Sequence, residues 1–275
     1  MNLPVVMTVA GSDNSAGAGA QADLKTMSAL GVYGVTAITC VVAEVPGKVS
    51  AIQAMEPSIV AEQIRLLFEA YPIAAMKTGM LFSREIMEAV IGELRKVERR
   101  PTLVVDPVMV ATSGDALLKN DAVSFYKEAL FPLATLITPN LDEARVLLGQ
   151  PISSVAEMRE AGRQLAQQYG CAFLMKGGHL RDAIATDLLV HPDGSFSEYS
   201  APFVPGVSTH GTGCTYSAAV ASGLGRGLAL ADAVAEAKSF VTNAIGNYLR
   251  WQRADGTETD ALHHLAGMSR ENVKT

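Results

Sequence analysis

Residues 4–31 have the sequence PVVMTVAGSDNSAGAGAQADLKTMSALG, in which an apolar run (4–10), a loop of Gly, Ser and Asp, and a stretch of helical periodicity (20–30) follow one another. An apolar run without polar alternation is typical of a strand buried on both faces. Gly31, directly after the periodic stretch, is a helix-stop signal. These residues therefore predict a buried strand, a glycine-rich turn and a helix, which together form the repeating unit of an α/β fold.

The same alternation continues along the chain and predicts a mainly parallel central sheet with helices on both faces. A hairpin at the sheet edge is expected in 185–200, where Pro192-Asp193-Gly194 separates two strand-like runs. In such sheets, ligands bind beyond the carboxyl ends of the strands. The further expected strands are 35–42, 73–77, 102–105, 133–138 and 171–175, and the further expected helices are 57–70, 83–98, 141–149 and 154–169.

Composition limits the class of protein further. The 275 residues carry a formal net charge of −6, so the chain lacks the basic surface that nucleic-acid binding requires. No apolar run approaches the ~20 residues of a membrane-spanning helix, and the first residues lack the pattern of a signal peptide. Three scattered cysteines form neither a disulfide framework nor a metal motif. We therefore expect a cytoplasmic protein with a single domain over residues 1–252 and a loose polar tail over residues 253–275.

The glycine-rich loop after the first strand leaves several interpretations open. Gly17 to Ala22 matches a loose GxGxxA dinucleotide pattern. In that pattern the first glycine lies directly at the strand end, but here the glycine at the strand end is Gly11 and the match begins only at Gly17. Two other interpretations are a surface loop without a ligand and a ligand site, in which small residues let the backbone and the helix N–H groups come close to the ligand. Asp23, early in the helix, either complements the helix dipole or contacts that ligand.

A second glycine turn, Gly211-Thr212-Gly213-Cys214, precedes a helix of small residues at 217–223. Successive N–H groups at such a helix start form a site for an anion, above all for a phosphoryl group in transfer. Cys214 stands in the first turn of this helix, where the dipole favours a thiolate, so we expect its pKa to lie below the free value of about 8.5. The other interpretation is a buried and inert cysteine.

The chain contains a series of motifs in a fixed order. They are Ala10-Gly11-Ser12-Asp13, Gly17-Ala18-Gly19, Gln21-Ala22-Asp23-Leu24-Lys25, Ala29-Leu30-Gly31-Val32-Tyr33-Gly34, Lys77-Thr78-Gly79-Met80-Leu81, Asp106-Pro107-Val108-Met109, Ser113-Gly114-Asp115, Ile137-Thr138-Pro139-Asn140-Leu141, Lys176-Gly177-Gly178-His179 and Thr209-His210-Gly211-Thr212-Gly213-Cys214-Thr215. Over roughly residues 4–250, this series resembles the hydroxymethylpyrimidine/phosphomethylpyrimidine kinases of thiamin synthesis, which belong to the ribokinase-like superfamily. The resemblance implies a ribokinase-like three-layer sandwich with a small flap.

The resemblance also implies roles for the second glycine turn. Gly211, Thr212 and Gly213 would form the anion hole that stabilises the transferring γ-phosphoryl group of ATP. Cys214 would be the base that takes the proton from the hydroxymethyl group of the substrate. Most kinases of the superfamily carry Asp where this branch carries Cys, so the last motif is the most specific one.

Further implied residues would bind the nucleotide and a magnesium ion. Asn140 and Glu143 would organise Mg²⁺ and its waters, with Asn140 also at the nucleotide, although Asn140 could instead only cap the helix at 141–149. Asp106 would be a further outer-shell metal residue, or it would tie down its own loop. Lys176 would neutralise phosphate charge, or it would be a solvated strand end.

The pyrimidine pocket would be lined by Gly11, Asp23, Met80 and Val108, with plain core filling as the alternative for Met80. Family members usually carry Gln after the second strand, where this chain carries Glu44. An ionised carboxylate only accepts hydrogen bonds, whereas an amide also donates. Glu44 therefore puts the second phosphorylation, of the monophosphate, in question, and it leaves pyridoxine/pyridoxal kinase activity as the alternative function.

A third hypothesis is a pyrimidine-binding module without turnover, which the intact glycine turn and cysteine disfavour. The expected partners are a small-molecule substrate and ATP with Mg²⁺, without nucleic acid and without a membrane. Relatives are commonly dimers, so the resemblance implies a homodimer. Whether a monovalent cation assists stays open.

Overall fold

The computed structural model describes residues 2–109, 120–180, 183–208 and 210–267 of the chain. Within these residues, a nine-stranded sheet has the strand order β3-β2-β1-β4-β5-β6-β7-β8-β9. Its strands are β1 (Val5–Asp13), β2 (Tyr33–Val45), β3 (Lys48–Ala54), β4 (Ile73–Thr78), β5 (Thr102–Val105), β6 (Leu136–Ile137), β7 (Ala172–Lys176), β8 (Ile184–Val190) and β9 (Phe196–Pro202). The six central strands, in the order β2-β1-β4-β5-β6-β7, pair in parallel. At the edges, β3 pairs antiparallel with β2, β8 with β7, and β9 with β8. The expected mainly parallel sheet is confirmed.

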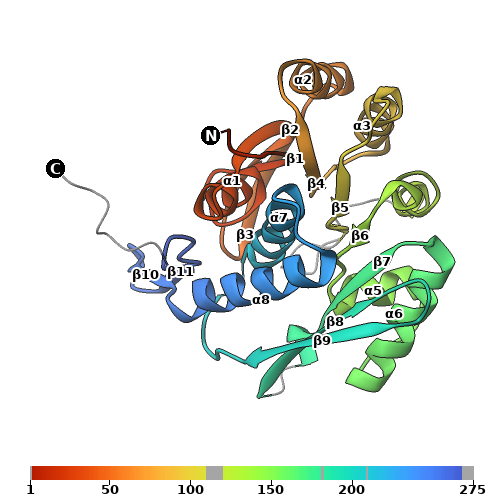
Figure 1. Cartoon of the computed structure of the whole chain (residues 1–275). Helices are drawn as coiled ribbons and strands as arrows, with labels where there is room; N and C mark the ends of the chain where they lie inside the picture. The colour runs from red at the N-terminus through yellow and green to blue at the C-terminus, as the bar shows by residue number, and fades with distance from the viewer. Residues whose placement is uncertain (1, 110–119, 181–182, 209, 268–275) are drawn as a thin grey trace.

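Helices cover both faces of this sheet, so the molecule has three layers (Figure 1). They are α1 (Gly19–Ala29), α2 (Pro57–Ala70), α3 (Arg84–Lys96), α4 (Asn120–Phe125), α5 (Leu141–Leu148), α6 (Val155–Tyr169), α7 (Thr212–Gly225) and α8 (Leu230–Gly246). One hydrophobic core joins the sheet to α2, α3, α5 and α6, and a second joins it to α1, α7 and α8. None of the helices in the described part of the chain is both long and apolar enough to span a bilayer.

The pleat of β1 explains why the sequence around it is apolar throughout. Val5, Met7 and Val9 lie in the first core, whereas Val6 lies in the second. Successive side chains of a strand point to opposite faces, so a strand covered on both sides needs apolar residues at every position. The run at 4–10 is therefore a central strand, as predicted.

Two predicted strands differ in length from the observed ones. The run 133–138 contributes only Leu136–Ile137 to the sheet, because Phe131–Leu133 forms a short 3₁₀ turn before it. β2 continues beyond 42 to Val45, because it pairs antiparallel with β3 across the turn at Pro46-Gly47. We call the projecting end of this β2–β3 hairpin the flap.

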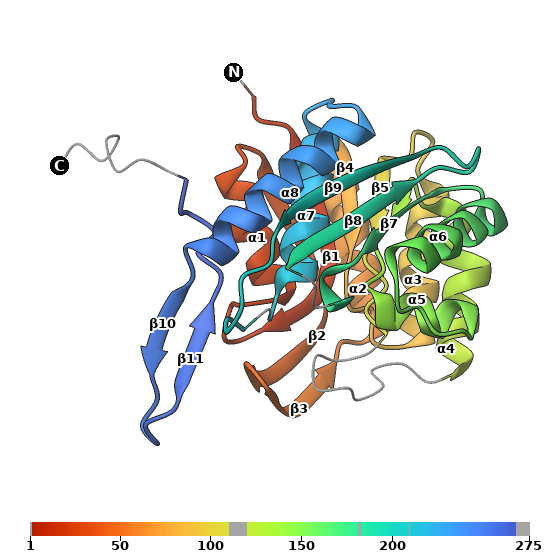
Figure 2. The ribbon, with the colours of Figure 1, turned by 90° about the horizontal axis from the view of Figure 1, so that it is seen from below.

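The end of the chain differs from the expected loose tail. β10 (Leu249–Gln252) and β11 (Glu258–Ala261) form a separate antiparallel hairpin that projects from the body of the molecule (Figure 2). Arg253 donates a hydrogen bond to the carbonyl of Pro46 in the flap (3.2 Å). Leu262 and His264, directly after β11, are buried. The expectation of a loose tail from residue 253 is therefore wrong for residues 258–264, which form β11 and then a segment with Leu262 and His264 buried.

Candidate active site

A cleft of about 970 Å³ opens at the carboxyl ends of the parallel strands. This is the place where open α/β sheets bind their ligands. Among its lining residues are Gly11, Glu44, Met80, Asp106, Val108, Asn140, Glu143, Lys176, Gly211, Thr212, Gly213 and Cys214. The structure thus brings together every candidate residue from the sequence except Asp23. The Ser113-Gly114-Asp115 motif lies outside the described residues.

The two glycine loops meet at the cleft, and both need glycine. Gly211 has φ +81°, and a Cβ at this position would lie 1.7 Å from the carbonyl oxygen of Gly17. Gly19 has φ +58°, and its Cβ would lie 2.5 Å from the carbonyl oxygen of Gly11. A side chain at either position would separate two backbones that now touch. The loop after β1 is therefore a structural partner of the turn before α7.

The first turn of α7 offers unpaired donors to the cleft. Gly211 is the N-cap residue of α7, and no side chain caps the helix. The first N–H groups of a helix have no partner within it, and the dipole adds positive potential there. The hydroxyl of Thr212 is buried and has no hydrogen-bond partner among the described residues. Such a helix start can bind an anionic group.

Cys214 lies in this first turn, with its side chain only partly exposed. Burial raises the pKa of its thiol to about 11, although the charge of Lys77 opposes this shift. Asp23 and Asp106 raise the pKa further, and a backbone hydrogen bond from Gly19 lowers it. The expectation of a lowered pKa is therefore wrong, because burial and two carboxylates outweigh the charge of Lys77 and the hydrogen bond from Gly19. Cys214 is a thiol at neutral pH in the chain without ligands.

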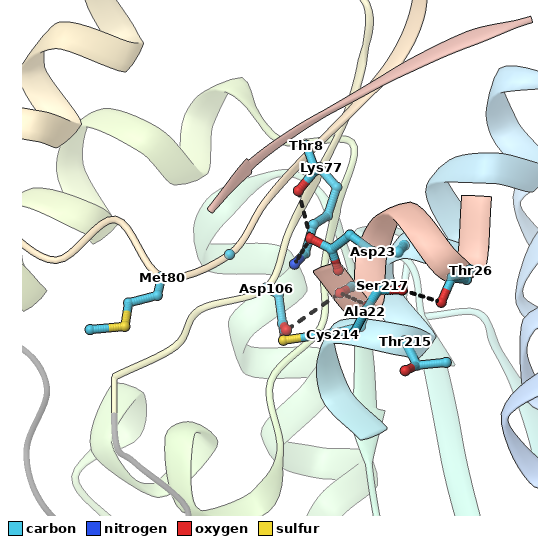
Figure 3. A network of polar contacts seen from close by, with 12 residues as sticks. Thr8, Ala22, Asp23, Thr26, Lys77, Met80, Asp106, Cys214, Thr215 and Ser217 are labelled. Carbon is cyan, nitrogen blue, oxygen red and sulfur yellow. Dashed lines mark hydrogen bonds and ion pairs between the residues drawn. The ribbon is translucent and has the colours of Figure 1, made fainter. Parts of the chain in front are cut away.

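Asp106 and Lys176 form a buried ion pair beside the glycine turn. The Lys176 Nζ donates to the Asp106 Oδ1 (2.9 Å), and that oxygen also accepts from the Thr138 hydroxyl (3.1 Å). The other oxygen of Asp106 accepts from the Ser217 hydroxyl on α7 (3.3 Å), as Figure 3 shows. Although burial raises the pKa of Asp106, the charges of Lys176 and Lys77 outweigh it and lower the pKa. Asp106 thus ties α7 to the ends of β5 and β7.

Asn140 and Glu143 form a capping box at the start of α5. The Asn140 Oδ1 accepts from the Glu143 N–H (2.9 Å), and the Glu143 Oε2 accepts from the Asn140 N–H (2.8 Å). The capping alternative for Asn140 is therefore observed. Burial raises the pKa of the Glu143 carboxyl, and Asp106 raises it further against the opposing charge of Lys176. Across residues 2–109, 120–180, 183–208 and 210–267, no three His, Cys, Asp or Glu side chains form a group that could hold a metal ion.

Glu44 lies at the flap side of the cleft with two other ionisable groups. Its backbone N–H donates to the Asn14 Oδ1 (2.7 Å), which links the flap to the first loop. Burial raises the pKa of the Glu44 carboxyl, and the negative charge of Asp13 adds to this shift. Asp13 itself is paired with His210 (3.1 Å), and the hydrogen bond to the Asp13 carboxylate raises the pKa of His210. This end of the cleft therefore holds two carboxyl groups and one histidine, and the raised pKa of that histidine favours a positive charge beside them.

Asp23 does not line the cleft, and the expectation that it contacts the substrate directly is not supported by its position. Its carboxylate is fully buried and accepts from the Thr8 hydroxyl (2.6 Å) and from the Lys77 Nζ (2.8 Å) (Figure 3). In the part of the chain that the structure describes, the other oxygen of Asp23 has no hydrogen-bond partner. Asp23 is the partner of a buried lysine, because the first turns of α1 pack directly over β1 and β4.

The sequence places Lys77 in a motif without a role for it, and no motif contains the pair of Asp187 and Lys238. Lys77 is the charged residue in the apolar strand β4, and it is fully buried. The Lys238 Nζ on α8 donates to the Asp187 Oδ2 on β8 (2.7 Å), and both residues line the cleft. A charged residue in an otherwise apolar run is the signal that could have found them, because an ion is buried only with a partner.

His264 provides a pH-dependent contribution to stability. Its Nε2 is 3.0 Å from the Thr215 hydroxyl, and burial lowers its pKa to about 4. Because an unfolded histidine titrates near 6.5, only the unfolded chain takes up this proton between about pH 6.5 and pH 4. We expect the free energy of unfolding to fall by roughly 2–3 kcal/mol as the pH drops through this window.

Urea unfolding at several pH values measures this loss. His264→Gln should remove most of it, whereas His191→Gln, at the β8–β9 turn, should leave it unchanged. An equal pH dependence in wild type and His264→Gln would contradict the assignment.

The fold and the site define a ribokinase-like kinase: a three-layer α/β domain with a glycine turn and a cysteine at a helix start beside the strand ends. A model of the phosphomethylpyrimidine kinase family matches residues 13–258. The chain belongs to this family.

Individual proteins agree with this result. The chain is 42% identical over 262 residues to a hydroxymethylpyrimidine/phosphomethylpyrimidine kinase of Rhizobium meliloti, which covers 95% of this chain and 97% of the relative. It is 46% identical over 241 residues to the thiamine biosynthesis bifunctional protein ThiED of Geobacter sulfurreducens, with 87% of this chain covered. The chain spans about half the length of that second relative (49%).

Solved structures of two kinds resemble the chain. Bacillus subtilis pyridoxal kinase, in an ADP complex, has a TM-score of 0.87 and 32% identity, with 96% of this chain and 98% of that chain covered. A phosphomethylpyrimidine kinase from Clostridium difficile 630 has a TM-score of 0.77 and 40% identity, with 88% of this chain and 99% of that chain covered.

Proposed function

We propose that this chain is an ATP-dependent kinase of thiamine biosynthesis that phosphorylates the hydroxymethyl group of 4-amino-5-hydroxymethyl-2-methylpyrimidine, and then its monophosphate. The observation that carries this proposal is the uncapped start of α7, where Cys214 and the unpaired Thr212 hydroxyl face the cleft beside Lys176. Family membership and the relatives of the same name support the substrate. Release of ADP in the presence of the pyrimidine alcohol, MgATP and this chain tests the proposal, and the absence of release above the ATP background contradicts it.

The geometry supports one division of roles in the transfer step. The hydroxymethyl oxygen attacks the γ-phosphorus of ATP, its proton passes to the Cys214 thiolate, and ADP leaves. The N–H groups of Thr212, Gly213 and Cys214 stabilise the negative charge on the phosphoryl oxygens. Lys176 adds a positive charge next to the turn, and Asp106 holds that lysine in place. Because the Cys214 thiol has a raised pKa, only the fraction of molecules in which it is a thiolate can accept the proton.

Magnesium is part of the proposal, and the donor set fits a phosphate-held ion. Mg²⁺ in kinases keeps several waters and takes its ligands from the nucleotide and one or two carboxylates. Asp106 already accepts from Lys176, Thr138 and Ser217, whereas Glu143, which also lines the cleft, accepts from the backbone N–H groups of Asn140 and Met109. Glu143 is therefore the carboxylate that would hold the waters of the ion, and Mg²⁺ would supply charge neutralisation on the phosphates.

We expect a substitution of Glu44 to change the preference of the enzyme among the pyrimidine alcohol, its monophosphate and pyridoxal. Glu44→Gln supplies an amide that donates as well as accepts, and it removes one negative charge near the incoming monophosphate. We expect kcat/KM for the pyrimidine monophosphate to rise by about 10-fold, the effect of roughly 1.4 kcal/mol. Steady-state kinetics with the alcohol, its monophosphate and pyridoxal measure this effect.

Gln53→Glu, on the flap strand β3 and outside the cleft lining, is the charge control for this measurement. Unchanged kinetics of Glu44→Gln with all three substrates would remove Glu44 from the substrate pocket. A preference for pyridoxal over both pyrimidines in the wild type would support the alternative function, in line with the likeness to pyridoxal kinase.

Three further properties belong to the proposal. A homodimer and a cytoplasmic location follow from the resemblance to relatives, and light scattering and cell fractionation test them. A monovalent cation would assist at the phosphates, and the rate in potassium compared with that in a large organic cation tests this role.

A further inference from the structure

We infer that the C-terminal segment 258–264, through Asp260 and His264, positions the catalytic turn that contains Gly211 and Cys214. This inference rests on the proposed function, because it assigns positioning residues to the transfer step. We call residues 258–264 the strap. The two side chains hold the turn from its two ends, one before Gly211 and one after Cys214.

Asp260 holds the residue at which the chain enters the turn. Its Oδ2 accepts a hydrogen bond from the Ser208 N–H (3.2 Å). The Ser208 hydroxyl in turn accepts from the His210 N–H (3.4 Å), and His210 directly precedes Gly211. Asp260 is itself fixed by Arg250, whose Nε and Nη2 donate to its two oxygens at 2.7 and 2.9 Å. The bidentate pair allows the carboxylate little freedom.

Arg250 adds a second connection to the same approach. Its Nη2 donates to the carbonyl oxygen of Gly206 (3.1 Å), two residues before Ser208. The carboxylate of Asp260 and the guanidinium of Arg250 therefore hold one donor and one acceptor of the backbone that leads into the turn. Both side chains come from the β10–β11 hairpin.

His264 holds the other end. Its Nε2 is 3.0 Å from the Thr215 hydroxyl, and this contact is buried. Thr215 follows Cys214 and is completely inaccessible to solvent (0%). The Thr215 N–H donates to the Gly211 carbonyl (2.9 Å), which closes the first turn of α7. A hydrogen bond at this place orients the residue next to the base.

Position matters at this turn because it contains both the base and the anion donors. A displacement of about 1 Å in a reacting group can reduce a rate by about 10²-fold. The turn cannot be fixed by a side-chain cap, because α7 has none. The strap supplies two contacts that the helix start itself lacks. This is why a hairpin that projects from the body is joined to the centre of the site.

The test compares variants that remove one contact each. Asp260→Asn weakens the hold on Ser208 and loses the ion pair with Arg250, and Thr215→Val removes the hydroxyl that faces His264 while it keeps the shape of the side chain. We expect each to lower kcat by about 10-fold or more and to change KM for ATP by no more than about twofold, since binding groups are untouched. Thr215→Ser keeps the hydroxyl and should restore most of the rate.

Asp255→Asn is the matched control. Asp255 lies in the turn of the same hairpin, and its carboxylate accepts from Thr257, at 3.0 Å from the N–H and 2.6 Å from the hydroxyl. We expect wild-type kcat for this variant, with Tm measured for all variants. A merely structural role would lower Tm or the folded fraction and leave kcat per folded molecule at its wild-type value in Asp260→Asn and Thr215→Val.

The outcomes separate the two proposals. If the wild type releases no ADP with the pyrimidine alcohol, the proposed function fails. If the wild type is active and kcat per folded molecule is unchanged in Asp260→Asn and Thr215→Val, the positioning role fails. A loss of kcat in both variants, with rescue by Thr215→Ser and no effect of Asp255→Asn, supports it.

Discussion

Replacement of Cys214 by alanine is expected to lower kcat by about 10²- to 10⁴-fold, the usual range for the loss of a general base. The nucleotide should still bind, because the N–H groups of the α7 start and Lys176 remain in place. Measurements of ADP release and of nucleotide affinity by fluorescence or calorimetry separate these two effects. A wild-type rate in Cys214→Ala would remove the cysteine from the mechanism.

The pH dependence of the wild type adds a second readout on the same residue. Burial raises the pKa of the Cys214 thiol to about 11. Below this pKa, the fraction of thiolate rises by about tenfold per pH unit, so kcat should increase with pH from 7 toward 10. Cys214→Ala should lose this increase. Cys171→Ala, at a buried cysteine outside the cleft lining, is the control that should keep both the rate and its pH dependence.

Gly211→Ala is the second change with a large expected effect. The new Cβ would overlap the carbonyl oxygen of Gly17, at 1.7 Å, so the turn and the first glycine loop must move apart. This movement displaces the N–H donors from the phosphoryl group. The loss of one such donor costs about 10²- to 10³-fold in kcat, and we expect a loss of at least this size. Steady-state kinetics on folded protein measure it.

Gly31→Ala is the matched control for this prediction. Gly31 also has positive φ (+73°), but a Cβ there has no neighbour within 4 Å. Both variants carry the strain of an alanine in the left-handed region, about 1–2 kcal/mol. Gly31→Ala should therefore lose stability and keep its kcat. An equal kcat for the two variants would mean that the contact between Gly211 and Gly17 has no part in the site.

The parallel sheet could be predicted because its signal is local. Each central strand is an apolar run that ends at Gly, Pro or Asp, and the pleat of β1 shows why polar alternation is missing. The glycine turn at 211–213 was also a local signal, since glycines before a helix of small residues describe an uncapped helix start. The other candidate residues that the sequence indicated line the same cleft as this turn, with the exception of Asp23.

Features that depend on distant parts of the chain could not be predicted. The pKa of Cys214 depends on how deeply α7 packs and on the charges of Asp23, Lys77 and Asp106, which come from α1, β4 and the end of β5. The pair of Lys77 and Asp23 joins residues 54 positions apart. β10 has four exposed residues, so it carries no apolar run that marks a strand.

The contact between Gly17 and Gly211 also has a consequence for the synthesis of the protein. The two halves of the anion site are separated by most of the chain, and the strap that follows ends near residue 264. The core between the sheet and α2, α3, α5 and α6 comes from residues that precede α7, whereas the opposite face of the sheet is fully covered only when α7 and α8 dock. Activity, in contrast, can only begin once the last fifth of the chain has docked. A nascent chain that is stalled before α7 should therefore have one face of its sheet incompletely covered and no kinase activity.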